Sequence, residues 1–110
     1  MLIQSDYFKI ITAVPVVDAD KVRKAMGDAG AGKQGNYSHC SGSQAIVGRF
    51  LPLRGANPAI GQIGRPEEVA EEKIEMLCHK DLVEQVVVAL KKAHPYEEPP
   101  IDILVRYEIE

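Results

Sequence analysis

Two segments of the chain repeat apolar residues at the three- and four-residue spacing of an amphipathic helix. The first ends before Gly30, a frequent helix stop. The second begins at Asp81, which forms a capping box with Glu84, and ends at His94 because Pro95 disfavours helical geometry before it. The apolar faces consist of Ala19, Val22, Ala25, Met26 and Ala29 in the first helix, and of Leu82, Val83, Val86, Val87, Leu90 and Ala93 in the second.

Between and around these helices lie segments with the patterns of β-strands. Some are short runs of β-branched residues, and others alternate apolar with polar positions. The expected strands are residues 8–15, 37–47, 48–53, 72–78 and 101–109. The second and third of these look like two strands joined around Gly48, and the last shows the clearest alternation in the chain.

The order of these elements predicts the fold. Read as strand, helix, two strands, helix and strand, it matches an α+β, ferredoxin-like βαββαβ arrangement. This arrangement has a four-stranded antiparallel sheet with two helices on one face. Residues 54–68 are rich in glycine and proline and form a connecting excursion. We expect a single domain over residues 1–110, with residues 1–6 as a loose N-terminus.

Helices on one face leave the other face of such a sheet uncovered. The outward positions of the first strand include Ile11 and Ala13, which are apolar. A second subunit is the economical cover for that face. The short chain points the same way, because a domain of 110 residues buries only about two-thirds of its unfolded surface. We therefore expect a homo-oligomer.

Composition and charge narrow the function classes. The chain has 13 basic and 16 acidic residues, which argues against a nucleic-acid or anionic membrane partner. No segment approaches the roughly 20 apolar residues that span a bilayer. The start MLIQSDYFKI lacks the features of a signal peptide, and two cysteines are too few for a disulfide scaffold. We expect a cytoplasmic protein with reduced thiols.

The candidate chemistry gathers in two places. In an extended segment Tyr37 and His39 share a face, whereas His39 and Cys40 point to opposite faces. His94 ends a helix, whose C-terminal dipole favours a protonated imidazole, and Glu97 follows it in a proline-bounded turn. His39, His94 and Glu97 are candidate ligands for a divalent metal such as zinc. Cys78 alternates in step with the apolar residues Ile74 and Met76, so it lies on the same, buried side of the strand, which predicts a structural thiol.

A small-molecule pocket is the other hypothesis for the same two places, with Tyr37, His39, Tyr96 and Glu98 as its residues. Such a pocket would form between subunits if the sheet brings the two segments together. Catalysis has weaker support, because serines that flank His39 on a strand do not by themselves provide the geometry of a nucleophile and its base. The glycine-rich residues 30–35 follow a helix instead of preceding one, so they do not form a phosphate loop.

Three motifs carry a resemblance to a known family: GAGKQGNYSHC at 30–40, FLPLRGANPAIGQIG at 50–64 and KKAHPYEEPPIDI at 91–103. Together they resemble the domain inserted in the Nif-three-like dinuclear metal-binding proteins of the YqfO type, which also occurs free-standing. HPYEEP is also similar to a segment of the CutA proteins. The resemblance implies a PII-like or CutA-like domain and, because CutA proteins are trimers, favours a trimer over a dimer.

The same resemblance limits what can be transferred. Full-length Nif-three-like proteins hold their two metal ions with residues of the flanking domains, which this chain does not contain. PII-like relatives bind effectors in clefts between subunits, which by analogy leaves open an anionic ligand near Lys33 and Arg49. The leading hypothesis is a binding or regulatory module that acts as a homo-oligomer. The sequence favours a binding protein over an enzyme. A divalent-metal-binding protein is the alternative, and a hydrolase is the third hypothesis.

Overall fold

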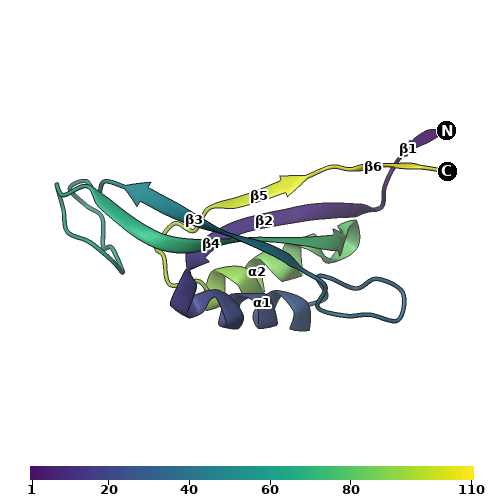
Figure 1. Cartoon of the computed structure of the whole chain (residues 1–110), viewed down its shortest axis with the longest axis horizontal. Helices are drawn as coiled ribbons and strands as arrows, with labels where there is room; N and C mark the ends of the chain where they lie inside the picture. The colour runs from purple at the N-terminus through teal and green to yellow at the C-terminus, as the bar shows by residue number, and fades with distance from the viewer.

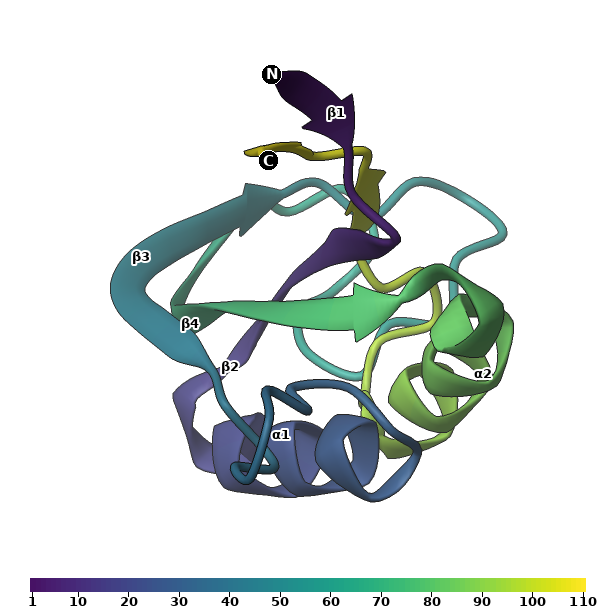
Figure 2. The ribbon, with the colours of Figure 1, turned by 90° about the vertical axis from the view of Figure 1, so that its right-hand side faces the viewer.

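The computed structural model describes residues 1–110 and confirms the predicted fold class. A four-stranded antiparallel sheet has the strand order β3-β4-β2-β5, and both helices lie on one face of it (Figures 1 and 2). The strands are β2 (Tyr7–Pro15), β3 (Gly42–Phe50), β4 (Glu67–His79) and β5 (Ile101–Leu104), and the helices are α1 (Ala19–Asp28) and α2 (Val83–Ala93). No helix is long and apolar enough to cross a membrane.

The core lies between the sheet and the two helices, where the predicted apolar stripes meet. Its fully buried members include Val22, Met26, Val86 and Leu90 from the helices and Ile10, Ile74, Met76 and Cys78 from the sheet. Cys78 is the buried thiol that its strand parity predicts, and burial raises the pKa of that thiol. Apolar burial of this kind is the main force that holds a small domain together.

The two halves of the chain follow the same path from strand to helix. A single 3-10 turn leads from β2 into α1 at Val16–Asp18, and another leads from β4 into α2 at Lys80–Leu82. The predicted capping box at Asp81 does not form: the side chain that caps this turn is His79, whose Nδ1 accepts a hydrogen bond from the Asp81 N–H at 3.2 Å. The helices run antiparallel, so the start of α2 lies beside the end of α1.

The strands in the middle of the chain differ from the sequence expectation, because residues 37–41 lie before β3 and residues 42–50 form one edge strand of the sheet. β3 is one unbroken strand that passes through Gly48, and its partner along the whole length is β4. The glycine was expected to separate two strands, because glycine weakens strand interiors. β4 starts at Glu67, inside the range assigned to the excursion, so the irregular connection covers residues 51–66.

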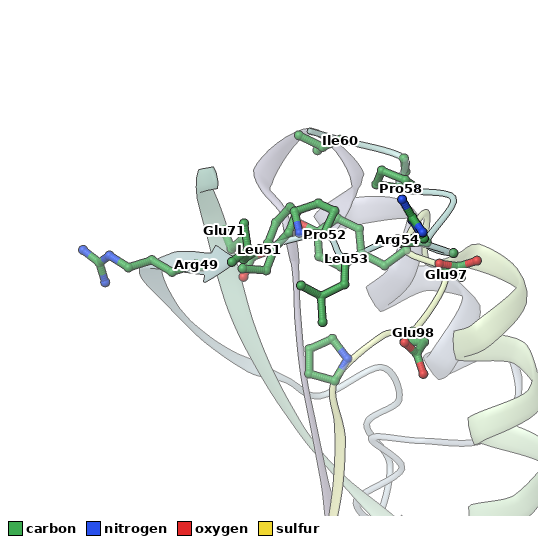
Figure 3. A pocket seen from close by; sticks show the side chains of 17 residues that line it. Arg49, Leu51, Pro52, Leu53, Arg54, Pro58, Ile60, Glu71, Glu97 and Glu98 are labelled. Atoms are coloured by element: carbon green, nitrogen blue, oxygen red, sulfur yellow. The ribbon is translucent and has the colours of Figure 1, made fainter. Parts of the chain in front are cut away.

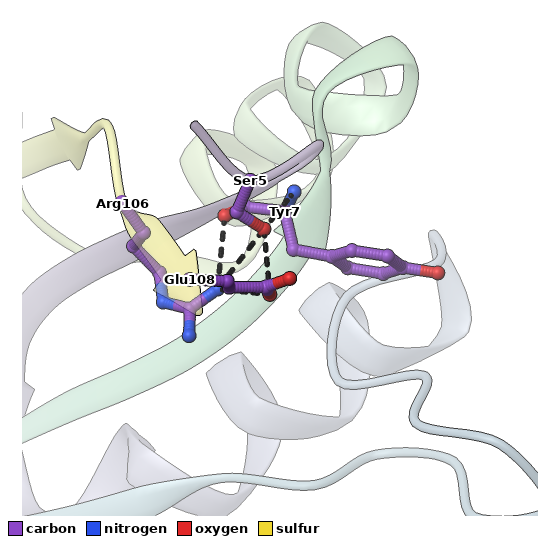
Figure 4. A network of polar contacts seen from close by, with 4 residues as sticks. All are labelled: Ser5, Tyr7, Arg106 and Glu108. Atoms are coloured by element: carbon purple, nitrogen blue, oxygen red, sulfur yellow. Dashed lines mark hydrogen bonds and ion pairs between the residues drawn. The ribbon is translucent and has the colours of Figure 1, made fainter. Parts of the chain in front are cut away.

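Residues 1–6 are not the loose terminus that the sequence predicts. Leu2–Gln4 forms β1, which pairs antiparallel with β6 (Tyr107–Ile109) in a separate two-stranded ribbon. The expected last strand is thus divided into β5 and β6. At the base of the ribbon, Ser5 Oγ donates to Glu108 at 2.8 Å, and Arg106 donates to Ser5 Oγ and to the Tyr7 carbonyl, both at 3.2 Å (Figure 4).

The ribbon and the connection at 51–66 make the molecule elongated. They extend from opposite ends of the sheet (Figure 1), and the principal dimensions are 51 × 26 × 24 Å. The radius of gyration is 15.4 Å, whereas a compact domain of this length would have about 13 Å.

The packing of α2 yields a first prediction. Leu90 is fully buried in the middle of the core, so Leu90→Ala should lower the free energy of unfolding by about 2 to 5 kcal/mol. Val88 lies on the same helix but is 54% exposed, so Val88→Ala is a matched control and should change stability little. Urea denaturation measures both variants. Equal losses in the two would show that α2 is not packed as described.

Candidate functional site

A cavity of about 790 Å³ opens where β3 and β4 reach one end of the sheet (Figure 3). Its lining comes from the end of β3, from Glu71 of β4, from the first part of residues 51–66, called here the cavity loop, and from the middle of residues 94–99, the HPYEEP turn, together with Pro100. The volume is in the range of small-molecule sites in proteins. The apolar side chains around it include Phe50, Leu51, Pro52, Leu53, Ile60 and Pro100.

The cavity exists because the strands end at different places. β2 stops at Pro15, opposite Glu71, so residues 67–70 of β4 pair only with β3. The HPYEEP turn occupies the space beyond the end of β2. Its exit is held by Thr12, whose hydroxyl donates to the Pro100 carbonyl at 2.7 Å. The backbone N–H of Asn57 donates to Glu97 at 3.1 Å and joins the cavity loop to the turn.

A buried carboxylate lies at the base of the cavity. Glu71 is only 4% exposed, and its Oε2 accepts a hydrogen bond of 2.5 Å from the Tyr96 hydroxyl. Burial first, and then this bond to Glu71, raise the pKa of Tyr96 well above its usual value. A Cβ atom at Gly48 would lie 2.1 Å from Glu71 Oε1, so any other residue at this point of β3 would displace the carboxylate from its present position. Gly48 therefore leaves room for the carboxylate where it forms its bond to Tyr96.

His94 anchors the turn through both nitrogens of its ring. Nε2 lies 2.7 Å from the Ala13 carbonyl, and Nδ1 accepts a hydrogen bond of 3.1 Å from the Tyr96 N–H. This pattern requires a neutral ring with its proton on Nε2. Burial lowers the pKa of His94 below its usual value, so the protonated imidazole expected at the helix end is wrong. Neither nitrogen is free for a metal ion, and the residue has a structural role here.

Aromatic contacts hold Tyr96 in place between the sheet and the helix end. Its ring makes an edge contact with Phe50 at a centroid distance of 5.8 Å and lies 4.9 Å from the ring of His94. Such pairs stabilise by about 0.5 to 1.5 kcal/mol beyond the area that they bury. Tyr96 therefore joins the last residue of β3, the middle of β4 and the end of α2.

The charged side chains around the cavity are not equivalent. Arg49 points away from it (Figure 3) and pairs with Glu68 at 3.3 Å. Arg54, Glu97 and Glu98 lie along the opening, and none of them takes part in an ion pair within the chain. Arg54 is thus the one cationic side chain that faces the three carboxylates of the cavity.

The structure separates the two groups of residues that the sequence singles out. Tyr96, Glu97 and Glu98 lie at the cavity, but Tyr37 and His39 lie on the connection between α1 and β3, at the other end of the helix pair. Tyr37 is 73% exposed. Within one chain these two groups do not form a common pocket, so the pocket predicted between subunits stays a prediction. Lys33 and Arg49 are likewise separated, because Lys33 lies on the connection before β3 and Arg49 lies near the other end of that strand.

His39 belongs to a local hydrogen-bonded array. Its backbone is left-handed, with φ of 59°, and its ring lies against Gly27 of α1. Nε2 lies 2.9 Å from Asp28, and Nδ1 lies 3.0 Å from the Ser38 hydroxyl. The contacts thus run from serine to histidine to aspartate as in a hydrolase triad, but with the two ring nitrogens exchanged, since Nδ1 and not Nε2 faces the serine. Neither of the two principal cavities includes Ser38 or His39, however.

The predicted metal ligands His39, His94 and Glu97 do not come together in one chain. No group of three or more His, Cys, Asp or Glu side chains is arranged to hold a metal ion. Because the histidines lie at opposite ends of the helix pair, the metal hypothesis requires residues from two copies of the chain and the loss of one hydrogen bond of the His94 ring. It remains a prediction on those terms.

Three residues of the site are missed by the sequence reasoning: Glu71, Phe50 and Arg54. Glu71 lies in the charged run EEVAEEKIE, where it is indistinguishable from solvent-facing glutamates. The signal that could have found it is Gly48, an interior strand glycine, because such a glycine often marks the close approach of another group. That group lies on the neighbouring strand, so sequence spacing alone does not identify it.

The buried imidazole predicts a pH dependence of stability. Because the pKa of His94 is lower in the folded than in the unfolded protein, the unfolded chain binds a proton first as pH falls through about 6.5. The free energy of unfolding should therefore decrease as pH falls below about 6.5. His94→Gln should have a shallower dependence in urea denaturation between pH 7.5 and 5.5. The same slope in both proteins would contradict a neutral, buried His94.

Comparison with known proteins gives one group of sequence relatives. No protein-family model matches the chain. A protein of Mycobacterium bovis named GTP cyclohydrolase 1 type 2 homolog is 46% identical over 99 residues, which are 90% of this chain and 26% of the relative. The Bacillus subtilis protein of the same name is 44% identical over 95 residues, 86% of this chain and 26% of the relative. The chain thus spans about a quarter of these relatives.

Solved structures agree with this relationship. A Bacillus cereus protein related to NIF3 matches 96% of this chain with a TM-score of 0.79 and 40% identity, over 26% of its own length. CutA from Synechococcus elongatus matches 98% of this chain and 85% of its own, with a TM-score of 0.69 and 17% identity, which shows a shared fold. The chain is therefore homologous to one segment, about a quarter, of the NIF3-related proteins named GTP cyclohydrolase 1 type 2 homologs, and its fold is CutA-like.

Proposed function

We propose that this chain is a self-associating module that binds a small molecule in the cavity between the cavity loop and the HPYEEP turn. The observation that carries the proposal is the cavity itself: about 790 Å³, apolar walls and a few polar groups of defined position. These are the usual properties of small-molecule sites. We propose binding in preference to catalysis, because no Ser, Thr, Cys, His or Lys side chain lines this cavity, and the pKa of its one hydroxyl, that of Tyr96, is raised well above its usual value.

A regulatory role follows from how loosely the cavity loop is tied to the rest of the chain. One hydrogen bond, from the Asn57 N–H to Glu97, links the cavity loop to the HPYEEP turn. The other hydrogen bonds of the loop join residues within it, such as the Gly64 N–H and the Pro52 carbonyl at 2.8 Å. A ligand that touches both walls would therefore add contacts that the free protein lacks. These contacts would move the cavity loop more than the HPYEEP turn. A surface at the end of an elongated molecule can transmit that change to a partner.

Filling the cavity tests this proposal. Ala59 lines the cavity and is exposed, so Ala59→Trp should block it without disturbing the core. Ala70 is also exposed but does not line the cavity, so Ala70→Trp is the matched control. A library of small organic fragments is titrated against the ¹⁵N-labelled proteins, and amide chemical shifts are followed by NMR. Bound fragments should shift the amides of the cavity loop and the HPYEEP turn.

Binding should be lost in Ala59→Trp and retained in Ala70→Trp. Fragments whose shifts cluster elsewhere on the protein, or which bind Ala59→Trp as well as the parent, would overturn the proposed site. The absence of any binding fragment would leave the module without a small-molecule function at this cavity.

We also infer that copies of the chain associate through the sheet face opposite the helices. Lys9 pairs directly with Leu77 on one side and Leu104 on the other, so the three side chains share this face, and Ile11 follows them. Leu104 is 46% exposed, and Leu77 and Ile11 are half-buried. A second copy would remove these apolar side chains from water. A trimer is the assembly that the CutA resemblance favours.

Light scattering coupled to size-exclusion chromatography tests the association. The particle mass should be a multiple of 12.1 kDa at micromolar concentration, three chains on the favoured assembly. Leu104→Glu should shift the mass toward one chain, because it places a charge in the proposed contact. Val88→Glu changes an apolar residue of similar exposure on the helix layer and should leave the mass unchanged. A strictly monomeric parent protein would contradict the inference.

A further inference from the structure

The carboxylate of Glu71 is buried without a cationic partner. Its Oε2 is bonded to the Tyr96 hydroxyl, and its Oε1 makes no hydrogen bond within the protein. No buried side-chain oxygen is left unsatisfied, so Oε1 must be accessible, and Glu71 lines the cavity. None of the nine ion pairs of the chain includes Glu71. An acidic group so far from solvent usually has a charged partner.

The other charged side chains that face the cavity add to an excess of negative charge. Glu97 and Glu98 lie on the HPYEEP turn at the opening, so three carboxylates surround the space. Arg54 is the one guanidinium that faces them, since Arg49 is turned outward toward Glu68 (Figure 3). A site walled by low-dielectric apolar groups and lined by an excess of one charge concentrates ligands of the opposite charge. The excess here favours a cation.

The shape of the site distinguishes an organic cation from a metal ion. A metal ion requires several ligands that converge within about 2 to 2.6 Å of one point. The carboxylates of the cavity are not grouped in that way. The volume of about 790 Å³ and the side chains of Phe50, Leu53 and Pro100 suit a body with apolar surface. The ring of Phe50 packs against Tyr96, which is the hydrogen-bond partner of the buried carboxylate.

We propose that the cavity binds an organic ammonium ion, a primary amine on an apolar or aromatic body, with the ammonium group at Glu71 Oε1. This inference rests on the proposed function and specifies its ligand class. The ammonium donates hydrogen bonds to Oε1 and supplies the positive charge that the buried carboxylate lacks. The apolar body lies against Phe50 and Leu53. Glu98, exposed at the opening, attracts the cation during entry.

Three probes of similar shape test the charge preference: phenethylamine, 2-phenylethanol and 3-phenylpropanoate. They differ mainly in carrying a positive, a zero and a negative charge at pH 7. NMR titration of the parent protein measures their dissociation constants at the cavity. The amine should bind at least tenfold more tightly than the alcohol, and the carboxylate should bind most weakly. Raising the salt concentration should weaken the amine more than the alcohol.

Two variants locate the effect. Glu71→Gln keeps the size and an oxygen acceptor for Tyr96, and it should weaken the amine about tenfold or more while leaving the alcohol unchanged. Glu98→Gln changes an exposed side chain, so it tests the charge effect without risk to folding and should weaken the amine by a smaller factor. Glu84→Gln, on the exposed surface of α2 away from the cavity, is the control and should change neither constant. Thermal melting verifies that each variant is folded.

The outcomes separate this inference from the function on which it rests. If amine and alcohol bind the cavity equally, or if both glutamine variants keep the full preference for the amine, the ammonium inference is overturned and the small-molecule function stands. If no probe binds although other fragments do, the ligand class is wrong and the site is right. If neither probes nor fragments bind, both proposals fail.

Discussion

The cavity depends on one buried hydrogen bond, from the hydroxyl of Tyr96 to the carboxylate of Glu71. It joins the turn after α2 to the middle of β4, two segments that no backbone ladder connects. Because neither group is well exposed to water, the bond is electrostatically strong and its loss would leave a polar group without a partner. Together with the bonds of His94 and Thr12, this contact fixes the HPYEEP turn and with it one wall of the cavity.

Several local features of the sequence serve that bond. Gly48 leaves room for the carboxylate, and His94 holds the backbone of Tyr96 by accepting its N–H. The end of β2 at Pro15 opens the space that the turn enters. Each of these residues looks unremarkable by itself: a strand glycine, a histidine at a helix end and a proline at a strand end. That all three support the contact between Tyr96 and Glu71 can be recognised only when the strand register is known.

The body of the fold is predictable from the sequence because its signals are periodic. The stripe around Leu90 and the alternation around Met76 repeat often enough to identify a helix and a strand, and the structure buries both residues. The ribbon of β1 and β6 is not predictable in this way, because a strand as short as Leu2–Gln4 contains no period, and its partner lies at the other end of the chain. Long-range pairing decided its structure.

The site was predictable only in part, for the same reason. HPYEEP stands out as a motif, and Tyr96 and Glu98 do lie at the cavity. His39 stands out equally, but it lies beside Asp28 at the far end of the helix pair. Glu71 has the charge pattern of a surface residue and is nonetheless buried. A sequence motif identifies residues with a role in their own segment. The distance between two motifs depends on which ends of the strands and helices are adjacent in the fold.

The most direct test of this account is the titration of Tyr96, followed by NMR of ¹³Cζ-labelled tyrosine in the parent protein and in Glu71→Gln. Burial and the bond to Glu71 raise the pKa of Tyr96, so its phenol should stay protonated well above the usual value near 10. In Glu71→Gln the pKa should fall but remain raised by burial, and Glu68→Gln should leave it unchanged. Ordinary titration of Tyr96 near 10 in the parent, unaltered by Glu71→Gln, would contradict the central role of this hydrogen bond.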